Sequence, residues 1–193
     1  MLRRAFLEST VPAFLGSTFV PGLLNSRPAA QGISTDAPQT GPFVLTASEG
    51  RTPRPLNVVG ERGLAKVRAA DSGGQLCFFE FVAPPKSGPP LHRHSREDEL
   101  FFVLEGEFVF QLDGVRHTVG PGGTVYSPRG VVHAYQNFTA SDARLLIANF
   151  PGAFGVMFEE MSAATPAGGM PPMDVLEALH RKYGITTMGP PLA

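Results

Sequence analysis

The sequence is poor in several features that would define other classes of protein. Its one cysteine, Cys77, excludes an internal disulfide and any metal site built from several thiolates. The formal net charge of −1 gives no electrostatic reason to bind nucleic acid or an anionic membrane. The weakly apolar stretch near residues 11–24 is short and interrupted by proline and glycine, so it cannot span a bilayer. We therefore expect no nucleic-acid partner and no stable membrane insertion.

Turn-forming residues and phenylalanine are plentiful, with Gly 22, Pro 19 and Phe 15, whereas tryptophan is absent. From residue 43 onward, short apolar runs alternate with turn sequences such as "DSGG" and "GPGG", and Asp113-Gly114 is typical of a tight hairpin. We expect strands near 43–47, 57–60, 64–69, 75–83, 99–105, 107–112, 115–119, 124–127, 131–138 and 143–150. Their spacing of roughly 8–12 residues favours an all-β sandwich or barrel, with Cys77 as a small core residue.

The N-terminal part has a different character. Arg3 and Arg4, followed by the weakly apolar stretch, resemble a twin-arginine export signal. We therefore interpret residues 1–30 as a signal segment and the polar, turn-forming residues 31–42 as a linker. A functional signal predicts an exported protein, periplasmic or extracellular, and without one the protein would be cytoplasmic.

The C-terminal part, residues 151–193, departs from the β pattern. Apolar residues at helical spacing over 152–164 favour one helix, and residues 171–184 predict a clearer one that Gly184 could end. Residues 185–193 are expected to form a loose tail. The chain thus reads as one β domain over 43–150 with a short C-terminal helical extension.

Three histidines and an acid could converge on a metal ion. His92 and His94 are separated by one residue, so on an extended strand both side chains face the same side. Glu99 follows after a turn, and His133 begins another strand much later in the chain. Three imidazoles and one carboxylate suit one divalent transition metal ion, whether Fe, Mn, Ni, Cu or Zn. The competing interpretation is a polar turn that merely precedes a core strand.

The spacing of these residues resembles the two motifs of the cupin superfamily. The first motif reads G-x5-H-x-H-x3,4-E-x6-G, which the chain meets with His92, His94, Glu99 and Gly106. The second reads G-x5-P-x-G-x2-H-x3-N, which it meets with Gly122, Pro128, Gly130, His133 and Asn137. One departure is visible, because the opening glycine of the first motif falls at Lys86, while the nearby glycine is Gly88.

The resemblance implies a double-stranded β-helix, or jelly-roll barrel, over residues 43–150. It also implies that His92, His94, Glu99 and His133 are the metal ligands. Among the three adjacent acids, only Glu99 fits the motif in residue type and in both spacings, so Glu97 and Asp98 are expected to form a solvated rim. Small cupins commonly pair through an edge strand, so a homodimer is expected.

The resemblance is nearest to small, single-domain, quercetin 2,3-dioxygenase-like cupins. In those proteins the metal binds an enolic or phenolic oxygen, and the carboxylate ligand can act as a base. The resemblance therefore implies a dioxygenase that acts on a small quercetin-like substrate, with Glu99 as a catalytic residue. Two alternatives stay open: a metal-dependent isomerase or lyase that uses no dioxygen, and a non-enzymatic cupin that binds a small ligand.

Other side chains are weighed by their position. Tyr135 lies two residues beyond His133 and should face the same side, where it either hydrogen-bonds a substrate or closes the core. We keep it as the second candidate catalytic residue. His117 and His180 are expected on the solvated surface. Several phenylalanines could line a pocket or fill the core, and two more could form a lid or dock a helix. They are Phe79, Phe81, Phe101, Phe108 and Phe110, and then Phe154 and Phe158.

Overall fold

The structure is a computed structural model that describes residues 41–166 and 169–193. The expected signal segment, residues 1–30, and residues 31–40 of the expected linker lie outside this range, so export stays a prediction. Within the described residues, no helix is both long enough and apolar enough to cross a membrane.

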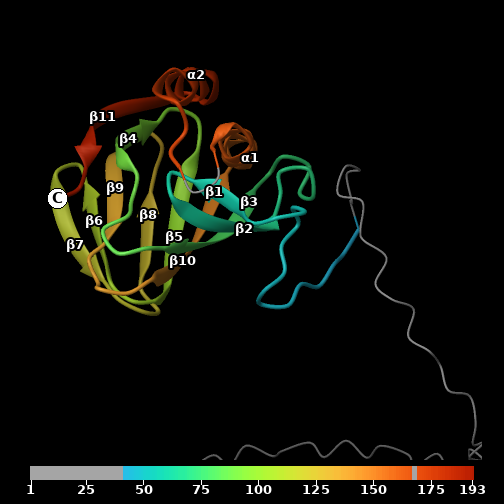
Figure 1. The fold of residues 1–193 in the computed structure, drawn as a ribbon, viewed down its shortest axis with the longest axis horizontal. Helices are drawn as coiled ribbons and strands as arrows, with labels where there is room; N and C mark the ends of the chain where they lie inside the picture. The colour runs from blue at the N-terminus through green and yellow to red at the C-terminus, as the bar shows by residue number, and fades with distance from the viewer. Residues whose placement is uncertain (1–40, 167–168) are drawn as a thin grey trace, which may run out of the picture. The chain divides into compact units, whose positions relative to one another are not determined.

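Two antiparallel sheets form the domain (Figure 1). The first has the strand order β1-β2-β3-β10-β5-β8, and the second has the order β11-β4-β9-β6-β7. The strands are β1 (Leu56–Val58), β2 (Glu61–Val67), β3 (Cys77–Ala83), β4 (Pro90–His94), β5 (Asp98–Glu105), β6 (Phe108–Leu112), β7 (Val115–Val119), β8 (Thr124–Ser127), β9 (Val132–Asn137), β10 (Ala143–Phe150) and β11 (Ile185–Pro191). The expected fold is confirmed: this is an all-β, double-stranded β-helix, or jelly-roll barrel, with a short C-terminal helical part.

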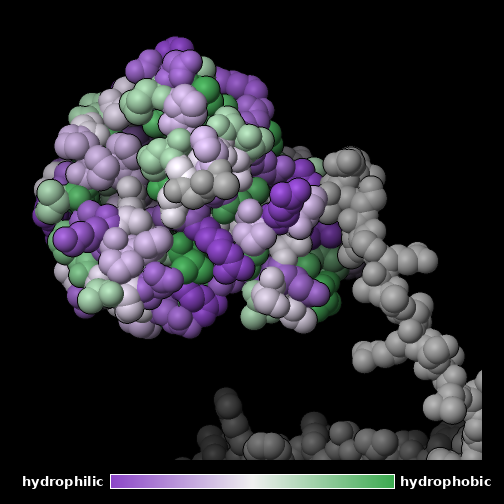
Figure 2. Space-filling view, viewed as in Figure 1, coloured by the Kyte–Doolittle hydropathy of each residue, from purple (hydrophilic) through white to green (hydrophobic). Residues whose placement is uncertain are grey.

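Alternating burial explains why these residues form a closed barrel. In β5, Phe101 and Val103 are buried while Phe102 between them is exposed, as period two requires. The five phenylalanines considered for a pocket are all fully buried in the core between the sheets: Phe79, Phe81, Phe101, Phe108 and Phe110. Cys77 is buried as expected. On the face shown in Figure 2, hydrophilic side chains predominate and apolar ones form small groups, so the apolar content is concentrated inside.

Three expectations about single elements are wrong. Residues 43–47 form no strand; Phe43 instead packs its ring against the guanidinium of Arg51, 4.4 Å from the ring centroid. Residues 90–94 form β4, which is missing from the expected strand ranges, although His92 and His94 were expected on an extended strand; a proline is tolerated as its first residue. Residues 185–191 form β11 rather than a loose tail, and its glycine and prolines suit the edge of the second sheet. The other expected strands are present, with bounds that agree to within three residues.

The two expected helices are confirmed as α1 (Phe154–Ala164) and α2 (Met173–Tyr183). Gly184 ends α2 in the left-handed conformation, with φ 74°, as a C-terminal glycine commonly does. The helices lie side by side at one end of the barrel (Figure 1). The ring of Phe158 packs edge-on against Phe79 and Phe81, with centroids 5.2 Å apart in both pairs, so α1 is docked on the core.

Lys86, the departure from the first motif, lies in the left-handed region with φ 63°. This conformation destabilises a residue that has a Cβ by roughly 1–2 kcal/mol, whereas glycine adopts it without this strain. Glycine is required at Gly88 for a different reason: a Cβ at this position would lie 2.0 Å from the carbonyl oxygen of Tyr135 and clash with it. Both positions thus favour glycine, but only one has it.

We therefore predict that Lys86→Gly stabilises the protein. The relief of left-handed strain is partly offset by the greater freedom of glycine in the unfolded chain, which leaves a gain of about 0.5–1 kcal/mol in the free energy of unfolding. Chemical denaturation measures this gain. Lys86→Ala is the control, because it removes the charge and the stem but keeps the Cβ, and it should not stabilise. Equal stability of Lys86→Gly and the wild type would contradict the prediction.

Candidate metal centre

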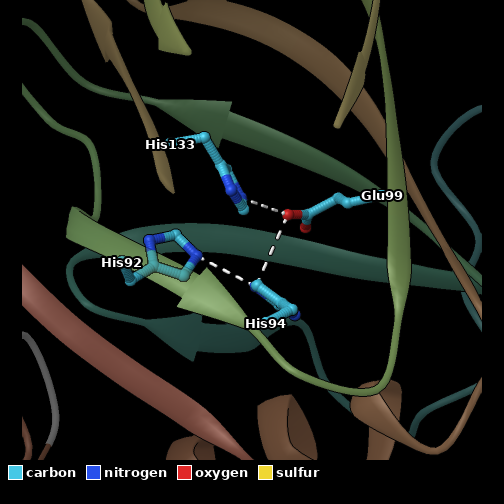
Figure 3. A group of neighbouring side chains, drawn as sticks. All are labelled: His92, His94, Glu99 and His133. Atoms are coloured by element: carbon cyan, nitrogen blue, oxygen red, sulfur yellow. Dashed lines mark hydrogen bonds and ion pairs between the residues drawn. The ribbon is translucent and has the colours of Figure 1, made fainter. Parts of the chain in front are cut away.

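Four side chains point toward one another inside the barrel (Figure 3). His92 and His94 come from β4, Glu99 from β5 and His133 from β9, and their ligand atoms all lie within 4.8 Å of one another. The Nε2 atoms of His92 and His94 are 3.0 Å apart, and Nε2 of His133 lies 2.8 Å from Oε2 of Glu99. Nε2 of His94 is 3.6 Å from the same oxygen. The structure thus brings together all four residues that the motifs single out.

Strand pairing places these residues at one point. His92 lies directly opposite His133 in the β4–β9 pair, and Arg93 between the two β4 histidines is exposed. Glu99 belongs to the other sheet, so the cluster bridges the two sheets across the barrel interior. A short turn joins β4 to β5 and carries the chain from one sheet to the other (Figure 3).

Backbone carbonyls orient two of the imidazoles. Nδ1 of His92 lies 2.8 Å from the carbonyl oxygen of Pro90, and Nδ1 of His133 lies 3.1 Å from that of Val131. A carbonyl oxygen only accepts hydrogen bonds, so each Nδ1 carries a proton. Nε2 of His92 then presents a lone pair to the cluster, whereas Nε2 of His133 donates to the carboxylate of Glu99 and would present a lone pair only after a metal replaces its proton. This is the arrangement that metal-binding histidines commonly have.

Charge also favours a metal at this point. Burial alone would raise the pKa of Glu99. The imidazoles of His94 and His133 outweigh burial and lower this pKa to about 2, so the carboxylate is ionised at neutral pH. Burial, together with the neighbouring His133 and His94, lowers the pKa of His92 well below its ordinary value, so this imidazole is neutral. Burial lowers the pKa of His133, but its hydrogen bond to Glu99 and the charge of Glu99 raise it above its ordinary value. A metal cation binds a negative oxygen and unprotonated imidazole nitrogens, so binding would release the proton that His133 shares with Glu99.

Buried polar atoms without a hydrogen-bond partner surround the same cluster. Among the described residues they are His94 Nδ1, Glu97 Oε2, Ser127 Oγ and Asn149 Nδ2. Ser127 and Asn149 are the two strand partners of Glu99, and Oε2 of Glu97 lies 3.7 Å from Nδ1 of His94. The expectation that Glu97 belongs to a solvated rim is wrong, because it is 2% exposed. A carboxylate behind a metal-binding histidine typically orients the ring.

The donor set fits one divalent transition metal ion. Ligand atoms about 2.1 Å from a common ion lie roughly 3.0–3.4 Å apart at square or tetrahedral angles. Three of the separations between these atoms are 2.8 Å, 3.0 Å and 3.6 Å, which bracket that range. His92, His94, Glu99 and His133 could therefore hold a metal with small side-chain adjustments.

A cavity adjoins the cluster, with about 60 Å³ available to the centres of water-sized molecules. His92 and Glu99 form part of its wall, and most of the rest is apolar, including Phe81, Phe101 and Phe154. The other polar lining residues are Glu61, Tyr135 and His180. No lysine or arginine lines the cavity in the described part of the chain. Helices α1 and α2 contribute to its wall through Phe154, Met157, Phe158, Met161, Leu176 and His180.

Tyr135 lines this cavity and also belongs to the core. Its ring packs against Phe101, Phe108 and Phe110, with centroids 5.7–5.9 Å apart. Its hydroxyl donates a 2.6 Å hydrogen bond to Oε2 of Glu61. Burial and the neighbouring Glu61 raise the pKa of Tyr135 well above its ordinary value, so the hydroxyl keeps its proton. Tyr135 therefore packs in the core, as one interpretation expects, and its hydrogen bond to a substrate stays a prediction.

One polar residue of the cavity, Glu61, was missed from the sequence, and another, His180, was expected in a different environment. Glu61 is in phase with the buried Gly63 and Ala65 of β2, so extending the strand alternation backward could have found it. His180 was expected to be solvated, which is wrong: it is half-buried, lines the cavity and lies 3.0 Å (Nδ1) from Oγ1 of Thr187. Its position four residues after the buried Leu176 was the available signal. His117 is exposed on β7, as expected.

Comparison with known proteins agrees with this geometry. Residues 79–149 match the family model described as a cupin domain. This part of the chain is thus a cupin domain. An uncharacterized protein from Methanocaldococcus jannaschii is 29% identical over 79 residues, which are 41% of this chain and 63% of that protein. The match therefore spans less than two thirds of that relative.

Two comparisons cover more of the partner protein. An oxalate-binding protein from Thermotoga maritima is 28% identical over 109 residues, which are 54% of this chain and 90% of that protein. The solved structure of a predicted oxalate decarboxylase from Thermotoga maritima has a TM-score of 0.52 and 21% identity, covering 56% of this chain and 99% of that chain. The structural likeness supports the shared fold.

The cluster predicts how metal content responds to substitution. His94→Ala removes an imidazole ligand without a substitute, so metal binding should fall by at least about 100-fold in affinity. Glu99→Gln keeps an oxygen and should lose metal only partly, by about 10-fold to 100-fold. Metal analysis of dialysed protein and competition with a chromophoric chelator measure both effects. His117→Ala, on the exposed face of β7, is the control and should bind metal like the wild type. Full metal content in His94→Ala would contradict the assignment.

Glu61 predicts a pH dependence of stability. Burial raises its pKa from 4.5 to about 7, although hydrogen bonds from Tyr135 and Ser87 lower it. The pKa of Glu61 is thus higher in the folded than in the unfolded protein. The unfolded state therefore loses its proton first, and the free energy of unfolding falls as the pH rises from the unfolded-state pKa through about 7. Glu61→Gln cannot ionise and should escape this loss. Relative to the wild type, its free energy of unfolding should increase by about 1–3 kcal/mol between about pH 5 and about pH 8.

Denaturation of chelator-treated protein at the two pH values measures this difference. Glu107→Gln removes an exposed carboxyl group and should leave the pH dependence of the wild type unchanged. If the Glu61→Gln and wild-type stabilities ran parallel from acid to alkaline pH, the carboxyl of Glu61 would titrate alike in the folded and unfolded states.

Proposed function

We propose that this cupin is a metal-dependent, dioxygenase-like oxidoreductase that acts on a small enolic or phenolic compound. The observation that carries the proposal is the apolar cavity beside a cluster of three histidines and an ionised carboxylate. A ligand with an apolar ring would contact the cavity wall, and its oxygen would face His92 and Glu99.

The charges around the cavity support a neutral ligand over an anion. The described lining contains two carboxyl groups, Glu61 and Glu99, and no lysine or arginine. An anionic ligand would therefore have only the metal as a positive partner. An enol or phenol enters neutral and loses its proton only at the metal, which suits this lining.

The metal, the carboxylate and the aromatic wall would each have a separate role in the reaction. A bound divalent metal would supply Lewis acidity that lowers the pKa of a coordinated hydroxyl. Glu99, ionised and hydrogen-bonded at 2.8 Å to His133, would accept the proton of that hydroxyl. Phe101 and Phe154 would exclude bulk water from the reacting atoms.

The size of the cavity limits the ligand. Its volume of about 60 Å³ is well below the roughly 150 Å³ of a dry cavity that admits benzene. Several waters fit, but an aromatic ring fits only if part of the wall moves. The part formed by α1 and α2 covers one end of the barrel, where a shift of Phe154 or Phe158 would enlarge the cavity. This favours a single-ring or smaller substrate over a full flavonol.

A second candidate is non-enzymatic binding of a small metal-chelating ligand. The observation that favours it is the similarity to the oxalate-binding protein from Thermotoga maritima, which extends over 90% of that relative. The same cluster would then hold a metal and a small ligand without turnover. The two candidates differ in whether dioxygen is consumed.

Oxygen uptake by the metal-loaded protein with catechol-type and single-ring enolic compounds tests the proposal. Uptake should occur with at least one of them and should fall by about 10²–10⁴-fold in Glu99→Gln, compared at equal metal content. Glu107→Gln should keep the wild-type rate. Turnover that persists unchanged under strict anaerobiosis would contradict the oxygenase, and a tightly bound compound that is never consumed would favour the binding protein.

A further inference from the structure

Glu61 is a buried acid that the metal centre does not use. It is 1% exposed, lies at the start of β2 and lines the same cavity as His92 and Glu99. It is absent from the group of residues whose ligand atoms converge, so it forms a second polar position on the cavity wall.

Two hydroxyl groups hold this carboxyl in place. Ser87 donates a 2.9 Å hydrogen bond to Oε1, and Tyr135 donates a 2.6 Å hydrogen bond to Oε2. The shorter bond has the length typical of a hydroxyl donor on an ionised carboxylate. A carboxylate offers about four lone-pair positions, so each oxygen can accept one more hydrogen bond.

Packing alone does not explain an acid at this position. Burial of a carboxyl without a cationic partner destabilises a fold, and the described cavity lining has no lysine or arginine. The unused lone pairs can accept a hydrogen bond from a donor in the cavity, whereas a second negative charge there would be repelled in surroundings of low polarity.

We propose that Glu61 is a specificity-determining residue, which selects a ligand with a hydroxyl donor at this wall and rejects one with a carboxylate there. The inference rests on the proposed function, because the ligand is taken to be anchored by an enolic or phenolic oxygen at the metal. It narrows the substrate class to neutral, hydroxylated enols or phenols and excludes dicarboxylates. Such rejection by an unpaired buried charge is a common source of specificity.

Three matched probes test this. They are hydroxypyranones that share one enol–ketone chelating group and differ in a single ring substituent: methyl, hydroxymethyl or carboxylate. Calorimetric titration of zinc-loaded protein gives their affinities, and zinc avoids oxidation of the probes. The titration is run at about pH 8, above the pKa of about 7 of the Glu61 carboxyl, so that this group is ionised. The variants are Glu61→Gln and the control Glu107→Gln, at verified equal zinc content.

The wild type should bind the hydroxymethyl probe more tightly than the methyl probe, and the carboxylate probe at least about 10-fold more weakly than either. In Glu61→Gln the carboxylate probe should gain at least about 10-fold in affinity. The methyl probe should be unchanged there, which shows that the metal end is intact. Glu107→Gln should behave like the wild type.

Two results would overturn the inference in distinguishable ways. If the wild type and Glu61→Gln bind the three probes in the same order and with the same ratios, Glu61 does not determine specificity, and the proposed function stands. If none of the probes binds to either protein, the enolic anchoring at the metal is wrong, and the proposed function fails together with the inference.

Discussion

The structure depends on the burial of one carboxylate and three imidazoles between two sheets. Glu99 and His94 are almost fully buried, and the neighbouring Ser127 and Asn149 leave polar atoms without partners. A buried polar side chain in an apolar barrel destabilises the fold unless its lone pairs have a partner. One divalent cation would accept a lone pair from each of the four side chains in the cluster. Metal binding would then stabilise the fold and also create a reactive centre.

The same constraint arranges the rest of the barrel. The apolar walls isolate the cluster from water, and α1 closes one end, where the ring of Phe154 lies 4.4 Å from that of His94. Glu61 and Tyr135 form a second polar position on the wall, and Ser87 holds Glu61 by a hydrogen bond, so a ligand would meet two chemically different positions in a mostly apolar space. The combination of a metal-facing end and a hydrogen-bond acceptor suggests recognition of a small, neutral ligand in a fixed orientation.

The residues of the cluster were predictable from the sequence because their spacing matches the two cupin motifs, which also single out Glu99 among three adjacent acids. His92 and His94 share a strand face, and the glycines and prolines around His133 are strong turn signals. Other features depend on contacts that spacing does not encode. Strand β4 was missing from the expected strands, although its two histidines were placed on a strand face, and β11 forms because the chain after α2 returns to pair with β4. Glu61 fell between the expected strands 57–60 and 64–69, because β2 begins three residues earlier than expected.

X-ray absorption spectroscopy of the metal-loaded protein is the most direct test that the four converging side chains bind one metal ion. We predict that three imidazole nitrogens and at least one carboxylate oxygen lie about 2.0–2.2 Å from the metal. In the His94→Ala variant one imidazole should be missing from any metal that stays bound. A wild-type spectrum with fewer than three imidazoles, or one unchanged by this substitution, would contradict this metal site.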